Sequence, residues 1–172
     1  KTMRTGQNFG ILYILLLICQ VLLCNYFQIT PYAMITLLPA MILCIPLTIS
    51  TIGCMLIAFA SGLAVDWLAE GVIGLNAAAL MPVALLRKSL IRIYFGEDLI
   101  TRKDSFSLRK YGIAKVSAAL FSALTVFLII YIVLDGAGTR TILFNLIRGG
   151  ITLILSYLVS LIVVNSLTPD DR

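Results

Sequence analysis

The sequence contains no histidine, and only 12% of its 172 residues are charged. Without histidine it lacks the commonest metal ligand and the commonest general base. The four cysteines lie in apolar runs without CxxC spacing, so neither a disulfide framework nor a metal site is predicted. HExxH, GxSxG and glycine-rich phosphate-loop motifs are also missing from the sequence. We therefore expect no catalytic residue, no metal and no cofactor, and a protein that is not an enzyme.

Apolar residues are abundant instead. They make up 60% of the chain, and the mean hydropathy is +1.06. A soluble domain is about half apolar and about a quarter charged, so lipid must be the solvent for much of this surface. A helix needs about 20 apolar residues to cross a bilayer. The sequence therefore predicts an all-α, polytopic membrane protein in which six transmembrane helices occupy nearly the whole of a single integral membrane domain, residues 1–172.

The hydrophobic runs place these six spans at 9–27, 32–47, 50–68, 72–94, 111–134 and 141–167. The first run lacks a small-residue cleavage site and is long enough to span, so we expect a retained helix rather than a signal peptide. Pro39 and Pro46 lie inside or at the end of the second span, where neighbouring helices can tolerate the kinks that proline produces. No charge separates the second span from the third, so their boundary is the least defined.

The basic residues determine the predicted topology. Of 13 lysines and arginines, eight lie between Arg87 and Lys115. With six spans, these eight share one side of the membrane with Lys1, Arg4 and Arg172. The positive-inside rule then predicts that both termini of this multi-pass inner-membrane protein are cytoplasmic. This clustering is not a nucleic-acid-binding face, and the basic segment 96–110 either anchors the topology or binds anionic lipid or a cytoplasmic partner.

The third predicted span combines small and acidic residues on one helix face. They recur at every fourth position: Cys54, Ala58, Gly62, Asp66 and Glu70. Small residues allow a neighbouring helix to approach closely. Arg148 lies about 10 Å into the last span, at 1.5 Å per residue, so we expect it to pair with Asp66 within the membrane. A tertiary clamp is favoured over a proton or ion relay, because the midplane positions are apolar.

Two further groups of small residues are candidates for helix packing or partner binding. Ala114, Ala118 and Ser122 form a stripe on the fifth predicted span, and Gly149 and Gly150 directly follow Arg148. The glycine pair could form a hinge, but close packing against a neighbouring helix is the favoured interpretation. The stripe is likewise more typical of packing than of a ligand site. The sequence does not determine whether it faces inward or toward a partner.

Residues 58–98 carry a resemblance to a known family. The matching residues are Gly62-Leu63, Asp66, Gly74 and Ala77-Ala78, followed by Arg87 and Arg92. This segment resembles the bacterial rod-shape-determining protein family MreD, particularly its Bacteroidetes forms. The run Leu15–Asn25, with Gln20 and Asn25 in an apolar helix, is similar to the opening of that family. Before Ala77, where the family often has a polar or basic residue, this chain has Asn76, a mild departure.

The resemblance implies a non-enzymatic scaffold of the cell-elongation machinery that supports rod shape and peptidoglycan synthesis. Its implied partners are MreC, whose single membrane helix would dock on the bundle, and RodA, the elongation transpeptidase and membrane lipids. It also implies a fold similar to the substrate-binding S-component of energy-coupling-factor transporters. A small-solute-binding transporter subunit is therefore the alternative function. An intramembrane enzyme is a weaker third possibility, since catalytic groups are lacking.

Overall fold

The computed structural model describes residues 3–26, 34–96, 112–135 and 142–167, and every regular element within them is helical. The all-α prediction is thus confirmed. The elements are α1 (Met3–Tyr26), α2 (Leu38–Cys44), α3 (Thr51–Val65), the π-helical turn η1 (Asp66–Glu70), α4 (Leu75–Phe95), α7 (Ile113–Asp135) and α8 (Ile142–Leu167). The basic segment predicted at 96–110 lies outside the described residues, apart from Gly96.

Four helical stretches within the described residues are long and apolar enough to cross a membrane: Phe9–Tyr26, Thr51–Ala69, Ala114–Asp135 and Leu143–Val164. Many of their outward side chains are large and apolar. On α1, for example, Ile11, Ile14 and Ile18 are 68%, 59% and 56% exposed. Such a surface is suited to hydrocarbon and not to water. The chain is therefore a membrane protein with at least these four candidate spans.

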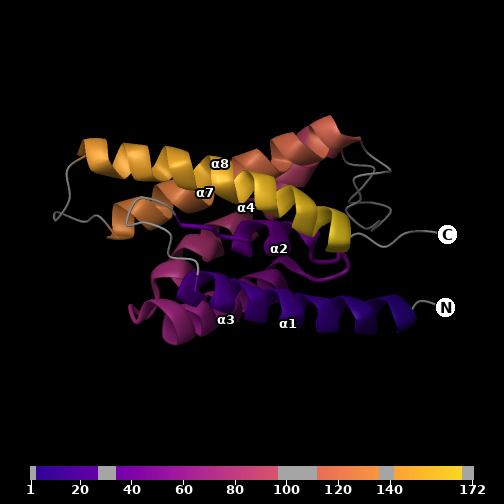
Figure 1. The fold of residues 1–172 in the computed structure, drawn as a ribbon. Helices are drawn as coiled ribbons and strands as arrows, with labels where there is room; N and C mark the ends of the chain where they lie inside the picture. The colour runs from indigo at the N-terminus through magenta and orange to yellow at the C-terminus, as the bar shows by residue number, and fades with distance from the viewer. Residues whose placement is uncertain (1–2, 27–33, 97–111, 136–141, 168–172) are drawn as a thin grey trace.

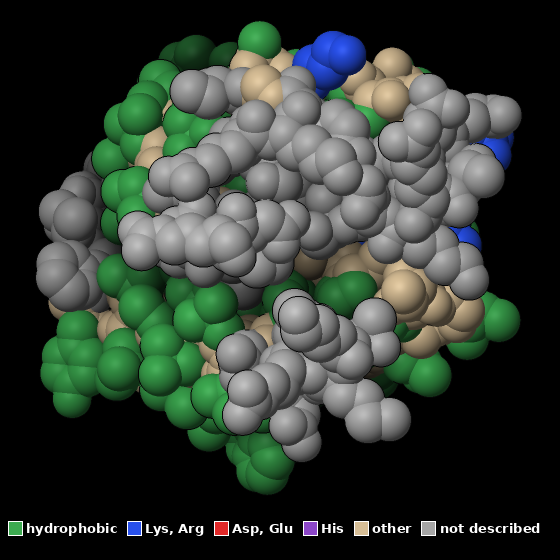
Figure 2. Space-filling view, turned by 90° about the vertical axis from the view of Figure 1, so that its right-hand side faces the viewer, with side chains coloured by type: hydrophobic (Ala, Val, Ile, Leu, Met, Phe, Trp, Pro, Cys, Tyr) green, Lys and Arg blue, Asp and Glu red, His purple; other side chains and the backbone are tan. Residues whose placement is uncertain are grey.

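The helices form a bundle around a buried centre (Figure 1). α2 lies between the side formed by α1 and α3 and the side formed by α7 and α8, and it contacts all five other α-helices. α4 packs against both α3 and α7. The two chain termini lie at the same end of the bundle (Figure 1). Seen from that end, lysine and arginine side chains lie at the upper and right-hand edges of the molecule, and hydrophobic side chains cover much of its left-hand and lower parts (Figure 2).

The prediction of a continuous second helix over 32–47 is wrong for the described part of this range. Residues 34–37 are not helical, α2 contains only 7 residues, and Ile45 is extended with φ −54° and ψ 137°. The prolines explain both ends. Pro39 lies in the first turn of α2, where a missing N–H is tolerated, and Pro46 disfavours the helical conformation of Ile45. The second segment is therefore interrupted instead of kinked.

The other five predicted spans coincide with helices. At most of the ends that the structure describes, the predicted and observed bounds differ by only a few residues. The range 50–68 corresponds to α3 and its continuation into η1, and 72–94 corresponds to α4. α4 contains 21 residues, but it carries Arg87, Lys88 and Arg92 and is not among the four most apolar candidates. The sequence predicts six spans and four helices qualify as candidates. The two predicted spans that do not qualify are the interrupted segment and α4.

Candidate functional site

The side chain of Asp66 links the end of α3 to the start of α4. It is fully buried as the first residue of η1, and its carboxylate accepts hydrogen bonds from the backbone N–H groups of Gly74 (2.9 Å), Asn76 (2.9 Å) and Ala77 (3.3 Å). The Asn76 amide side chain donates a fourth bond, of 2.9 Å. The first N–H groups of a helix have no partner within it. Asp66 therefore caps α4 although it belongs to the preceding helical segment. A negative charge at this position is also stabilised by the positive, N-terminal end of the α4 dipole.

Gly62 makes this closure possible. A Cβ added to it would lie 2.5 Å from the Cα of Ala77, so α3 and α4 touch through their backbones here. Ala58, one turn earlier, is fully buried. Gly74 has φ +100°, a conformation that favours glycine. The small-residue face of α3 therefore points into the bundle, while the side chain of Glu70 lies outside the described part of the chain.

The predicted pair between Asp66 and Arg148 is wrong. Arg148 forms an ion pair with Asp135, the last residue of α7, in which the side chains are 16% and 26% exposed. Asp66 takes its four hydrogen bonds from the start of α4 instead. The physical reason is packing: α8 lies mainly against α7 and α2, so its arginine meets the end of α7. A charge clamp exists within the described residues, but it joins α7 to α8.

A set of polar side chains supports the non-helical backbone that precedes α2. Thr36 N–H donates to Ser156 Oγ at 3.0 Å, and Met34 N–H donates to Thr152 Oγ1 at 3.3 Å. Gln20 accepts from Leu37 N–H at 2.8 Å and donates to the carbonyl of Ile35 at 3.1 Å. Non-helical backbone at membrane depth is tolerated only where the protein satisfies its polar groups. Side chains of α1 and α8 meet that requirement.

Arg87 supports the other end of α2. Its side chain is 1% exposed, and its guanidinium donates from Nε to the Leu43 carbonyl at 3.3 Å and also to the Ile45 carbonyl. A further contact reaches Cys54 Sγ at 4.0 Å. A cation at the C-terminal end of a helix is favoured by the helix dipole and by the unpaired carbonyls there. Among the described residues no carboxylate contacts Arg87, and its hydrogen-bond acceptors are these backbone carbonyls.

We call these four residues, Gln20, Arg87, Thr152 and Ser156, the polar frame. Together they hold an interrupted segment in the centre of the bundle. Sequence reasoning identified Gln20 and Arg87 only as parts of a resemblance and of a basic cluster. It missed Thr152 and Ser156, although their i, i+4 spacing within an apolar helix is a usable signal for one polar stripe facing the interior.

Outside the bundle centre, two hollows of about 420 Å³ and about 450 Å³ lie along the surface where α7 and α8 meet. Leu153 lines both hollows, and we call the two together the α7–α8 groove. The first hollow is lined by Thr125, Leu128, Ile129, Ile132, Val133, Asn145, Leu146, Gly149, Gly150 and Leu153. The second is lined by Tyr94, Ser117, Ala118, Phe121, Ser122, Leu153, Ile154, Tyr157 and Leu158.

The small residues of the fifth and sixth predicted spans lie along this groove. Ala118 and Ser122 are half-buried in its wall, and Ala114 is exposed one turn earlier. A Cβ on Gly149 would lie 2.7 Å from Ile132 Cδ1, whereas a Cβ on Gly150 would meet no atom within 4 Å. Gly149 therefore serves internal packing and Gly150 opens the groove. Unlike the stripe on α3, the stripe on α7 faces outward.

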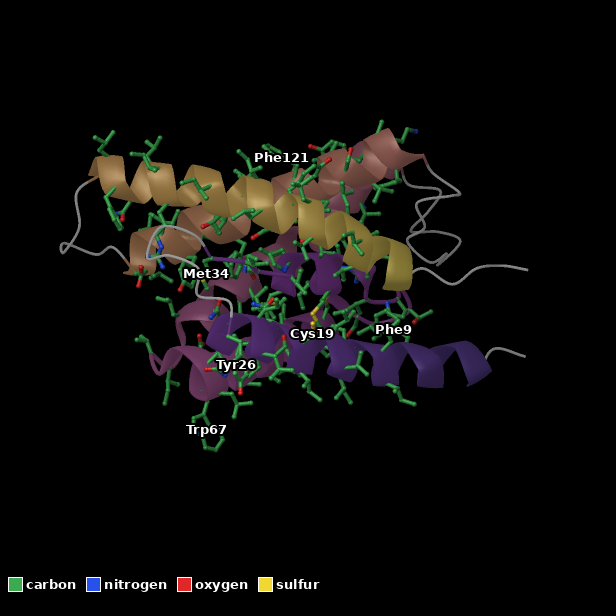
Figure 3. All side chains as sticks on the ribbon, in the orientation of Figure 1. Phe9, Cys19, Tyr26, Met34, Trp67 and Phe121 are labelled. Atoms are coloured by element: carbon green, nitrogen blue, oxygen red, sulfur yellow. The ribbon has the colours of Figure 1, made fainter. Side chains whose placement is uncertain are left out.

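The groove offers few free polar groups. Ser122 Oγ donates to the Ala118 carbonyl at 2.9 Å and lies 2.6 Å from Tyr94 Oη, and Ser117 Oγ donates to the Ala114 carbonyl at 2.9 Å. Phe121 and Tyr157 pack edge to face on opposite walls, with ring centroids 6.1 Å apart; Phe121 is labelled on α7 in Figure 3. The groove is thus suited to an apolar occupant.

Fold and site together define the class of protein, an all-helical membrane bundle with an interrupted segment at its centre and an open groove on one side. No protein family, no curated protein and no solved structure matches this chain.

Proposed function

We propose that this protein is a non-enzymatic membrane scaffold that binds a single transmembrane helix of a partner protein in the α7–α8 groove. The observation that carries the proposal is the length of the groove. On α7 it extends from Ser117 to Val133, which is about 24 Å at 1.5 Å per residue. That is most of the roughly 30 Å hydrocarbon core. A groove of this length accommodates a helix that crosses the membrane.

The surface chemistry of the groove supports a helix as the occupant. Membrane helices associate through close van der Waals fit and a few polar contacts, because lipid tails are as apolar as leucine. Gly150 and Ala118 leave room for a partner backbone to approach. The hydroxyl groups of Ser117 and Ser122 already have partners within the protein. Binding would therefore depend on shape.

The proposed topology has six crossings with both termini in the cytoplasm of a bacterial cell, in its inner membrane. The crossings comprise α1, the interrupted segment that contains α2, and α3, α4, α7 and α8. An even number of crossings brings both termini to one end of the bundle, the arrangement seen in Figure 1. The concentration of basic residues between Arg87 and Lys115 then assigns that end to the cytoplasm.

Within this class we propose an MreD-like component of the cell-elongation complex. The groove would bind the membrane helix of MreC, and RodA and the elongation transpeptidase would assemble beside it. Support comes from the residues that carry the resemblance. Gly62, Asp66, Gly74 and Ala77 are separated in sequence but form one structural unit, the capped junction of α3 and α4. Residues that form one structural unit support the resemblance more strongly than common residues scattered over the structure would.

Leucine substitutions in the groove test the proposal. Ala118→Leu and Gly150→Leu would fill the groove, so we expect loss of co-purification with MreC and rounding of rod-shaped cells. Because neither added side chain enters the bundle core, the purified variants should keep the thermal stability of the parent. Ala60→Leu is the matched control, since Ala60 is exposed on α3 away from the groove. It should retain both the partner and the cell shape.

The same strains also test the alternative function. If the groove variants bind MreC and support rod shape as well as the parent does, the docking proposal is wrong. If depletion of the protein leaves cell shape intact and abolishes uptake of one vitamin, the scaffold must be abandoned for a solute-binding transporter subunit.

A further inference from the structure

The chain has a single tryptophan, and it lies at the tip of the bundle. Trp67 is 78% exposed in η1 and points away from the helices, with Tyr26 of α1 nearby (Figure 3). The neighbouring Leu68, Val72 and Ile73 are also exposed. We call these five residues the aromatic tip. It lies at the end of the bundle opposite the two termini (Figure 1).

The aromatic tip is held by the backbone of the α3–α4 connection. Asp66, directly before Trp67, is buried and fixed to the start of α4 by its four hydrogen bonds. Gly71 N–H donates to the Asp66 carbonyl at 2.9 Å and closes the π turn. The side chain of Asn25 donates to the Leu68 carbonyl at 3.2 Å and ties the end of α1 to the same turn. The fold therefore presents these apolar side chains outward from a fixed position.

We propose that the aromatic tip inserts into the bilayer, at the boundary between headgroups and acyl chains in the leaflet farthest from the termini. Trp67 lies in the last turn of the candidate span Thr51–Ala69, in which Phe59 is also exposed, so a bilayer that surrounds this span would contact both rings. Tryptophan and tyrosine are enriched at this boundary because one part of each ring is apolar and another forms hydrogen bonds. The occupant of this surface is lipid.

Insertion depends on apolar burial and not on attraction to charged headgroups. The sequence has no lysine or arginine between Arg4 and Arg87, so no basic residue is available in the chain segments that form the tip. Anionic lipid would therefore not be required. The insertion fixes the depth of the capped α3–α4 junction and places the Asp66 carboxylate just inside the bundle at the membrane boundary. This inference needs only a bilayer and is independent of the proposed partner.

Fluorescence of the full chain in phosphatidylcholine nanodiscs tests the inference, because Trp67 is the sole tryptophan. We expect weak quenching by aqueous acrylamide and strong quenching by phosphatidylcholine brominated near the headgroup. Lipid brominated deep in the acyl chain should quench less. Adding anionic phosphatidylglycerol should leave this order unchanged.

The matched control moves the reporter along the same helix. In the double variant Trp67→Phe with Phe59→Trp, the indole lies about 12 Å closer to the bilayer centre, at 1.5 Å per residue, so the deeply brominated lipid should quench it more strongly. Free access of acrylamide to Trp67 without bromolipid quenching would overturn the inference, because the tip would then lie in water. Protection that appears only at high protein-to-lipid ratio would also overturn it, by showing that a second copy covers the tip.

Discussion

Gly62 and Ala77 bring α3 and α4 into backbone contact, since a Cβ on Gly62 would lie 2.5 Å from the Cα of Ala77. One turn later, this proximity allows the Asp66 carboxylate to reach the first N–H groups of α4. Close packing and helix capping therefore depend on each other. Because Gly62 has no side chain, α3 and α4 lie close enough for the Asp66 carboxylate to accept hydrogen bonds from the start of α4. Disturbing either residue should disturb the other.

Gly62→Ala should destabilise the bundle by about 1–3 kcal/mol, because overpacking against backbone atoms forces the helices apart. Thermal unfolding in detergent measures the effect. Gly10→Ala is the matched control: Gly10 lies on α1, and a Cβ there would meet no atom within 4 Å. That substitution should be neutral or stabilising by up to about 1 kcal/mol through helix propensity. Equal stability of the two variants would show that the α3–α4 contact is looser than the structure indicates.

Asp66→Ala should cost about 2–3 kcal/mol, because it leaves buried N–H groups at the start of α4 without an acceptor. Asp66→Asn keeps one acceptor oxygen but loses the charge, so its loss of stability should be smaller. Denaturant titration of the three proteins gives the order. Hydrogen exchange at Asn76 and Ala77 should rise most in the alanine variant. Unchanged exchange at these two amides would contradict the capping role.

Arg87→Met should destabilise the protein by about 2–3 kcal/mol, since the carbonyls of Leu43 and Ile45 lose a buried charged donor. Arg87→Lys should fall between the parent and the methionine variant, because an ammonium is a point charge and lacks the planar fork of the guanidinium. Lys115→Met, at an exposed position on α7, is the control and should change stability little. If Arg87→Met proves as stable as the control, the arginine is not needed to hold α2.

The Arg148–Asp135 ion pair predicts an energetic coupling between α7 and α8. A double-mutant cycle with Arg148→Met and Asp135→Asn should give a coupling of about 1 kcal/mol or more, as contacting charged residues do. The same cycle with Asp66→Asn in place of Asp135→Asn should give a coupling near zero. A large coupling between Arg148 and Asp66 would restore the pairing that the sequence suggested.

Hydropathy was sufficient to predict where most helices lie. α1, α7 and α8 follow apolar runs whose lengths match a bilayer, and α3 carries its small residues on one face, as the four-residue spacing indicates. These features are properties of single segments. The break in the second segment was also within reach of the sequence, because Pro39 is favoured at the start of a helix and Pro46 disfavours the helical conformation of the residue before it. Treating both prolines as kinks produced the error.

The sequence by itself determined that the solvent of this protein is lipid. It also determined the helical form, because a backbone in lipid must satisfy its own hydrogen bonds. Only the tertiary structure decided which polar groups meet. Arg148 pairs with Asp135 and not with Asp66 because helix rotation and neighbour order set distances between segments, and hydropathy contains neither. The same holds for Gln20 and Ser156, which reach the backbone beside α2 from two different helices.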